Sequence, residues 1–306
     1  MTRANRHPVR GIALIVVAIV VGACAPQGGT GSVTEQATPT LNASATPSPS
    51  PTPPRVMRVA VIGDYGSGWP TQHEVADRMC RWRERHPFDH VVTTGDNIYP
   101  DGSKAHFRDN FFEPYECLLS AGVRFHASLG NHDRMTARGR DILDEPAFGM
   151  PRRNYVWRKA GVRFVIADSS VLNREWLSEA LRPEALDRWT VVVFHHPVYS
   201  GGTTYGPSGS TLRRDLPALF RERGVDLVLN GHDHIYSATR SLRGIRYVTT
   251  GGGGASLYRC GDYAYVAACQ ARNHFVYVIA GSDRIKVRAV PRVGRPFHRF
   301  WTTGRT

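Results

Sequence analysis

The sequence predicts an α/β fold with mixed β-sheets and a metal site at the carboxyl ends of the strands. Five short apolar runs each end directly in polar side chains, and helix-like stretches separate several of these runs along the chain. Strands that alternate with helices favour parallel pairing, and ligands gather at the carboxyl ends of such strands. Three hairpin-like patterns add antiparallel pairs, so we expect the sheets to be mixed.

The five strand-like runs and the polar residues after them are 59–63 before Asp64, 91–95 before Asp96, 125–130 before Asn131, His132 and Asp133, 191–194 before His195 and His196, and 225–229 before Asn230, His232 and His234. Apolar residues at helical spacing predict helices at 72–85, 174–181 and 212–223. The expected antiparallel pairs are 154–158 with 162–167, 235–241 with 245–250, and 275–280 with 284–290.

The composition is that of an ordinary globular chain with a strong positive charge. Of 306 residues, 41% are hydrophobic and 21% charged, which excludes a wholly disordered, collagen-like or multi-span membrane protein. The net charge of +13 favours anionic partners such as nucleic acid, anionic lipid or phosphorylated substrates. All but three of the 39 basic residues are arginines spread along the chain, with no basic arm. A general coding bias toward arginine explains this distribution better than selection for binding to a polyanion, so we expect no specific nucleic-acid partner.

The first 23 residues read as an export signal. Arg3, Arg6 and Arg10 precede an apolar run at 11–23, which is too short to span a bilayer and suits a signal-peptide core. The run ends in Val-Gly-Ala before Cys24, which resembles the lipobox of bacterial lipoproteins. That resemblance implies cleavage before Cys24 and attachment of lipid to it, whereas an ordinary signal peptide is the alternative.

Residues 24–54 are predicted to form a tether, and residues 55–306 the folded domain. The tether is rich in Ala, Gly, Pro, Ser and Thr and cannot bury a core. The domain is long enough for one large α/β core. We therefore expect an exported protein, lipid-anchored to the outer face of the bacterial cell membrane.

The strand-end residues together indicate a metal site. A single histidine after a strand is more often a capping or core residue, and a single Gly-Asp is usually a turn. Here carboxylates, an Asn carbonyl and several imidazoles recur at five strand ends, a donor set that suits borderline divalent or trivalent ions. His232 and His234 lie two residues apart, so both face one side of an extended segment and can serve neighbouring metals.

Five ordered blocks resemble the calcineurin-like metallophosphoesterases. The blocks are Asp-Tyr-Gly at 64–66, Gly-Asp-Asn-Ile-Tyr at 95–99, Gly-Asn-His-Asp at 130–133, Val-Val-Phe-His at 192–195 and Gly-His-Asp-His at 231–234. The resemblance implies a sandwich of two mixed β-sheets flanked by helices, with a dinuclear metal centre at the carboxyl ends of the strands. Tyr99 narrows the resemblance to the purple acid phosphatases. Residues 63–66 and 195–200 resemble those of the tartrate-resistant type. The alternative to metal ligation by Tyr99 is that this aromatic residue packs against the sheet.

The resemblance implies two metal ions, Fe(III) and a divalent Fe, Zn or Mn. The ferric ligands would be Asp64, Asp96, Tyr99 and His234. The divalent ion would use Asp96, Asn131, His195 and His232, with Asp96 bridging the two. An anionic phenolate and carboxylates suit a hard trivalent ion, and neutral donors suit its divalent partner. Strand alternation predicts that His196 points away from the site.

The implied reaction is hydrolysis of a phosphate monoester, a small-molecule substrate, by a metal-bound hydroxide. His132 would be a catalytic residue that protonates the leaving oxygen, and Asp133 would orient it; the alternative for this pair is structural support of Asn131. Where the animal enzymes carry His-Gly-Pro in a substrate loop, residues 201–207 offer Tyr205. A phosphodiesterase or nucleotidase on the same site is an alternative, and a non-catalytic surface-binding lipoprotein is a weaker one.

Four cysteines remain besides Cys24, and export favours their oxidation. Three pairings are possible. Proximity favours Cys260 with Cys269, which leaves Cys80 with Cys117, although free buried thiols are an alternative.

Overall fold

The structure is a computed structural model that describes residues 56–205 and 210–304. The signal peptide and tether predicted for residues 1–54 lie outside the described residues, as do Gly206 and Pro207 of the loop that carries Tyr205. Within the described ranges, no helix is long and apolar enough to cross a membrane.

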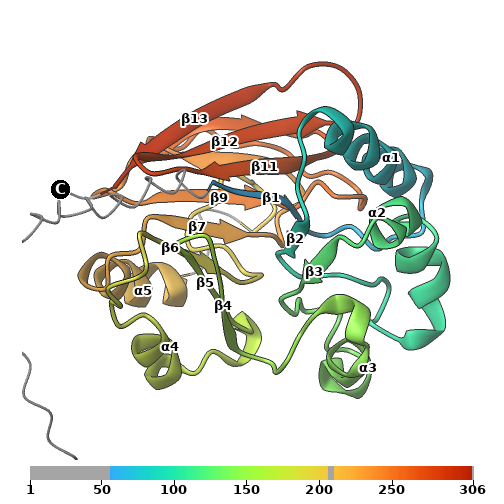
Figure 1. The fold of residues 1–306 in the computed structure, drawn as a ribbon, viewed down its shortest axis with the longest axis horizontal. Helices are drawn as coiled ribbons and strands as arrows, with labels where there is room; N and C mark the ends of the chain where they lie inside the picture. Colours follow the sequence, from blue (N-terminus) through green and yellow to red (C-terminus); the bar gives the residue numbers. More distant parts are fainter. Residues whose placement is uncertain (1–55, 206–209, 305–306) are drawn as a thin grey trace, which may run out of the picture. The chain divides into compact units, whose positions relative to one another are not determined.

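Two mixed β-sheets with flanking helices form the fold, which confirms the predicted fold class (Figure 1). Sheet A has the strand order β13-β12-β11-β1-β2-β3. Its strands are His298–Thr303 (β13), Arg284–Pro291 (β12), His274–Ala280 (β11), Met57–Ile62 (β1), His90–Thr93 (β2) and Arg124–His126 (β3). Within it, β1, β2 and β3 run parallel, and β1 pairs antiparallel with β11.

Sheet B has seven strands in the order β10-β8-β9-β7-β6-β5-β4. They are Val266–Gln270 (β10), Tyr236–Thr239 (β8), Arg246–Thr250 (β9), Leu227–Asn230 (β7), Trp189–Val193 (β6), Val162–Ile166 (β5) and Tyr155–Lys159 (β4). The four central strands β5, β6, β7 and β9 are parallel. All three predicted antiparallel pairs are present, as β4 with β5, β8 with β9, and β11 with β12.

The predicted helices are confirmed as α1, α4 and α5. The α-helices are Pro70–Arg85 (α1), Glu116–Ser120 (α2), Arg140–Asp144 (α3), Arg174–Ala180 (α4) and Ser210–Glu222 (α5). Short 3₁₀ turns at Lys104–His106, Ala137–Gly139, Pro146–Phe148 and Ser169–Val171, and a π-helix at Arg108–Phe112, occupy the connections. The sequence did not predict α2, α3, β10 or β13.

Successive side chains of the apolar strands point alternately into two buried layers, which explains the nearly unbroken hydrophobic runs of these strands. Val191 and Val193 of β6 join the core that also holds Val59 and Val61 of β1. Val192, between them, joins a second cluster with residues of α4 and α5. The sandwich therefore buries both faces of β6, and only the strand ends remain for polar chemistry.

Both expected disulfides are present, Cys80–Cys117 and Cys260–Cys269. The first joins α1 to α2, and the second links the segment before β10 to β10 itself.

Candidate metal centre

The predicted site residues meet where five strands end. The loops after β1, β2 and β3 of sheet A face the loops after β6 and β7 of sheet B, and their side chains form two contiguous clusters. The predicted ligands that they bring together are Asp64, Asp96, Tyr99, Asn131, His195, His232 and His234.

The first cluster surrounds the hydroxyl of Tyr99. Its Oη lies 3.1 Å from Asp96 Oδ2, 3.1 Å from His234 Nε2 and 3.5 Å from Asp64 Oδ1. His234 Nε2 is in turn 3.4 Å from Asp64 Oδ1. Three oxygen donors and one nitrogen therefore surround a common point, and this is the set implied for the ferric ion.

The second cluster surrounds the amide oxygen of Asn131. His195 Nε2 lies 2.9 Å from Asn131 Oδ1, and His232 Nδ1 lies 3.0 Å from the same atom. The two imidazole nitrogens are 3.2 Å apart. Asp96 Oδ2 is 3.4 Å from His195 Nε2, so one carboxylate oxygen belongs to both clusters. This arrangement places Asp96 where a bridging ligand would lie.

Hydrogen bonds from the protein direct histidine lone pairs into the site. His195 Nδ1 faces the carbonyl oxygen of Thr94 at 2.9 Å, and His234 Nδ1 faces that of Ser256 at 2.7 Å. Because a carbonyl oxygen only accepts, each Nδ1 must carry the proton, and each Nε2 is left facing carboxylate oxygens. Such a contact is stable only when a second proton on the imidazole or a metal ion lies between the two atoms.

The pKa values of the site residues also indicate that the site favours positive charge. Asp64 and Asp96 are both buried, and burial raises the pKa of Asp64. Although burial lowers the pKa of His195, the carboxylates of Asp96 and Asp64 raise it to about 10. Burial and the same two carboxylates raise the pKa of Tyr99 well above its usual range. The donor set therefore fits strongly charged metal ions, which would offset the carboxylates and allow a phenolate.

The backbone is strained at the ligands. Asp64, Asp96 and His232 have φ values of 56°, 50° and 68°, in the left-handed region that side chains other than glycine rarely adopt. Such strain is characteristic of functional sites. Two glycines make room for the carboxylates, because a Cβ at Gly130 would lie 2.1 Å from Asp96 Oδ1 and one at Gly231 would lie 2.4 Å from Asp64 Oδ2.

His132 lies at the rim of the centre. Its backbone N–H donates to Asp96 Oδ1 at 2.9 Å, and its ring lies 4.4 Å from the Tyr99 ring. Its Nδ1 faces the carbonyl oxygen of Pro100 at 2.5 Å. Pro100 therefore orients this imidazole, and the expectation that Asp133 does so is wrong.

Asp133 instead joins two of the ligand loops. It is fully buried and accepts hydrogen bonds from the backbone N–H groups of Asn97, Ile98 and Gly130 at 2.8, 3.1 and 2.8 Å. Burial, together with Asp96, raises the pKa of Asp133 to about 7. The structure thus gives Asp133 the supporting role that was the alternative for this residue.

His196 does not point away from the site as strand alternation predicts. Strand β6 ends at Val193, so the alternation does not extend to this residue. The His196 ring lies 4.5 Å from the ring of His232, and its Nδ1 is 2.8 Å from Ser169 Oγ. His196 is therefore a neighbour of the residues predicted to hold the divalent ion.

Two tyrosines cover the histidines that are predicted to bind metal. The ring of Tyr205 stacks on His232 at 4.2 Å, and that of Tyr258 stacks on His234 at 4.3 Å. Their loops pair, since Thr203 N–H donates to the carbonyl oxygen of Arg259 and Gly202 forms a bridge with Cys260. The sequence analysis singled out Tyr205 but missed Tyr258, which no motif marks.

Two cavities flank the centre and leave room for a substrate. One, of about 500 Å³, is lined by Tyr99, His234 and Tyr258 among others. The other, of about 590 Å³, is lined by Asn131 and His196 together with residues of α5.

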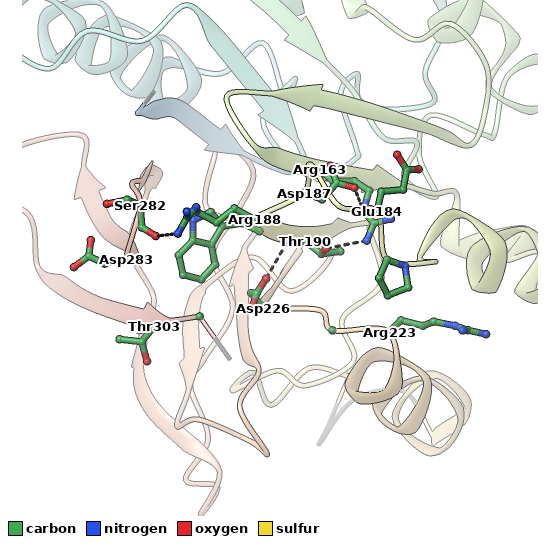
Figure 2. Close-up of a pocket in the computed structure, with 14 residues that line it drawn as sticks. Arg163, Glu184, Asp187, Arg188, Thr190, Arg223, Asp226, Ser282, Asp283 and Thr303 are labelled. Carbon is green, nitrogen blue, oxygen red and sulfur yellow. Dashed lines mark hydrogen bonds and ion pairs between the residues drawn. The ribbon is translucent and has the colours of Figure 1, made fainter. Parts of the chain in front are cut away.

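A third cavity, of about 510 Å³, lies at the opposite ends of the same strands (Figure 2). Its buried polar groups bond to one another. Arg163 donates to Thr190 Oγ1 at 3.0 Å, and the backbone N–H of Thr190 donates to Asp226 Oδ2 at 2.8 Å. Arg163 Nε also lies 3.2 Å from Asp187 Oδ2. Hydrogen bonds and an ion pair therefore join the buried polar groups of this cavity, which is remote from the candidate metal centre.

The sequence model of the calcineurin-like phosphoesterases matches residues 57–236, and the chain belongs to this family. Purple acid phosphatase 3 of Arabidopsis thaliana is 30% identical over 256 residues, which cover 70% of this chain and 68% of the relative. Together with the fold, these findings confirm the prediction of a metal-dependent phosphatase.

Two solved structures share the fold at low sequence identity. Purple acid phosphatase PPD1 from seeds of yellow lupin (Lupinus luteus) has a TM-score of 0.71 and 19% identity, and the alignment covers 81% of this chain and 54% of that one. GAP50, the anchor in the inner membrane complex of Plasmodium, has a TM-score of 0.72 and 18% identity, with coverage of 82% and 90%.

Proposed function

We propose that this chain hydrolyses phosphate monoesters at a dinuclear centre. Asp64, Asp96, Tyr99 and His234 would hold Fe(III). Asp96, Asn131, His195 and His232 would hold a divalent Fe, Zn or Mn. The observation that carries the proposal is the pair of donor clusters that share one oxygen, Asp96 Oδ2.

The difference between the clusters supports two different ions. The first cluster contains two carboxylates and a phenol, and the high pKa of Tyr99 means that only a strongly charged cation would ionise it. The second has one carboxylate, an amide oxygen and two imidazoles, a softer set that suits a divalent ion. When bound, the two ions would supply a hydroxide nucleophile near neutral pH and offset the charge of the phosphoryl oxygens.

The residues of the chain hold the ligands and handle the leaving group. Thr94 and Ser256 fix the tautomers of His195 and His234, so that their Nε2 lone pairs stay directed into the site. His132 is held at Nδ1 by Pro100, which leaves Nε2 as the atom able to deliver a proton to the leaving oxygen. Its position at the rim supports this catalytic role.

The N-terminal 54 residues support export and attachment to a membrane through lipid on Cys24. On this proposal the phosphatase acts on the outer face of the bacterial cell membrane, on small phosphate esters that reach the site from outside the cell. Mass spectrometry of the membrane fraction tests it. A diacylated or triacylated N-terminal Cys24 is expected, and a free N-terminus at another residue would contradict it.

Metal content, a visible spectrum and two substrates test the enzymatic proposal. We expect purified residues 52–306 to hold iron and, when oxidised, to show the charge-transfer band of a phenolate bound to Fe(III). Tyr99→Phe should lose this band and keep the fold. A preparation without iron or band would contradict the purple acid phosphatase assignment. Faster hydrolysis of a phosphodiester than of a monoester would favour the diesterase alternative.

A further inference from the structure

The outer face of sheet A beyond helix α1 carries a strongly basic surface, here called the basic face. Strand register defines it. Arg58 of β1 pairs with Ile279, Ile279 pairs with Lys286, and Lys286 pairs with Trp301 of β13. Paired residues project to the same side of a sheet, so these four side chains form one row across four strands.

A second row lies two residues along the strands, on the same side. Tyr277 pairs with Arg288, and Arg288 pairs with Arg299. Helix α1 covers this side only at its near end, where the Trp82 ring packs edge-on against Phe275 and Tyr277. The first row remains open, and Trp301 is 60% exposed.

The cations of the basic face form no ion pairs. In the part of the chain that the structure describes, Arg58, Lys286, Arg288 and Arg299 are not ion-paired, and the nearby Asp283 pairs with Arg284 while its charge also reaches Lys286. Helix α1 adds the positive charges of Arg78 and Arg85 to those of the basic face. Burial lowers the pKa of His86, and the charges of Arg288, Arg78 and Arg85 lower it further, so each of these three guanidinium groups lies near His86.

An open row of unpaired cations around an exposed tryptophan suits a membrane surface. Lys and Arg are attracted to anionic headgroups, and Trp favours the headgroup level of a bilayer. The described chain also begins at Val56, two residues before Arg58. Asp64 lies six residues farther along the chain than Arg58, about 20 Å at the rise of a strand, so a membrane here would leave the metal centre free.

We propose that the basic face docks on a membrane rich in anionic phospholipid, with Trp301 at the headgroup level. The proposal stands apart from the proposed phosphatase activity, since none of its residues belongs to the metal centre. Residues 52–306 can be tested alone, because they form one compact unit that contains both disulfides and every described strand and helix.

Sedimentation with lipid vesicles tests the proposal. We expect residues 52–306 to bind vesicles of phosphatidylcholine and phosphatidylglycerol in equal parts, to ignore pure phosphatidylcholine, and to dissociate as salt is raised. The double variant Lys286→Glu/Arg299→Glu should bind at least about twentyfold more weakly. The control Arg152→Glu/Arg240→Glu changes the net charge equally at exposed positions off sheet A and should stay within about threefold of wild type.

Two further measurements separate the possible outcomes. Trp301→Ala should weaken vesicle binding but leave any binding to duplex DNA unchanged, whereas equal losses on both would show a general polyanion surface and overturn the proposal. Equal losses in the two double variants would also overturn it, because net charge alone would then explain binding. Phosphate-ester hydrolysis should be unchanged in all these variants, so failure of docking and failure of the enzymatic proposal are distinguishable.

Discussion

The two ends of strands β6 and β7 both carry buried polar groups beside a cavity, yet they are chemically opposite. At the amino ends, in the cavity of Figure 2, Arg163, Thr190 and Asp226 form a network in which each group has a partner of the opposite kind. At the carboxyl ends, His195 Nε2 faces the oxygen atoms of both Asn131 and Asp96. What marks a candidate metal site is therefore the convergence of several ligand atoms on one point, and not the size of a cavity.

The histidine pairs of the molecule repeat this contrast. His90 Nδ1 lies 3.0 Å from His126 Nε2, and in that pair one ring donates its proton and the other accepts it. His195 Nε2 and His232 Nδ1 lie at a similar 3.2 Å, but both also face Asn131 Oδ1. One proton suffices for the first pair, whereas the second converges with Asn131 Oδ1 and so offers three ligand atoms to a single cation.

The largest expected effect is that of Asp96→Asn at the carboxyl end. The change removes the negative charge that both metal clusters share, so we expect hydrolysis of a phosphate monoester to fall at least about 10³-fold. The thermal midpoint of the metal-loaded protein should fall, because ions that bind only the folded chain are lost. Steady-state kinetics and thermal unfolding measure the two effects, and activity within tenfold of wild type would contradict the dinuclear mechanism.

At the amino end, Arg163→Met should lower the stability of the domain and leave catalysis nearly unchanged. It leaves the buried Asp187 without one partner and Thr190 without a donor, and breaking a buried pair costs about 3 kcal/mol of unfolding free energy. The kcat of the folded, metal-loaded enzyme should stay within twofold of wild type. Arg188→Met, at an exposed residue of the same cavity, is the matched control. A large loss of kcat in Arg163→Met would show that the two ends are coupled.

His126→Phe should change the acid stability of the domain. Burial lowers the pKa of His126 to about 3, so between that pH and about 6.5 the unfolded chain binds a proton that the folded chain does not. Wild type should therefore lose up to about 3 kcal/mol of stability between pH 7 and pH 4, and the variant should lose less. Urea unfolding at several pH values measures the slope, with His73→Phe at an exposed histidine as control. If stability changed with pH by the same slope in wild type and His126→Phe, the predicted contribution of His126 would be contradicted.

The smallest expected effect concerns the loops that carry the two tyrosines. Cys260–Cys269 holds the strand segment against which Gly201 and Gly202 pack, next to Tyr205. Replacing both cysteines by serine should raise KM by about fivefold to tenfold with little change in kcat. The same replacement at Cys80 and Cys117, far from the centre, should lower stability and leave KM unchanged. A KM rise of equal size in both variants would refute a local role.

Much of the fold was predictable because its central strands are apolar on both faces and end in polar ligands. Strands β10 and β13 were not predicted because they lie at sheet edges and lack a continuous run of buried residues. In β13, buried residues alternate with exposed ones such as Arg299 and Trp301. The short helices α2 and α3 lack enough turns to show a periodicity.

The metal ligands were predictable from their order at strand ends, but their environment was not. Ser256 and Tyr258 reach His234 from a loop that only tertiary packing brings near. His196 was misplaced because strand geometry was extended past the end of β6. The role of Asp133 depends on three backbone N–H groups from two loops, which side-chain patterns do not reveal.

Metal stoichiometry tests the central claim most directly. Elemental analysis of residues 52–306, purified after growth with iron and zinc, should find two metal ions per chain. The amino-end variant Arg163→Met should also hold two, and Asp96→Asn should hold fewer. A wild-type protein that stays metal-free after such growth, or Asp96→Asn that retains both ions, would contradict the claim that the convergent donors at the carboxyl ends are a dinuclear metal centre.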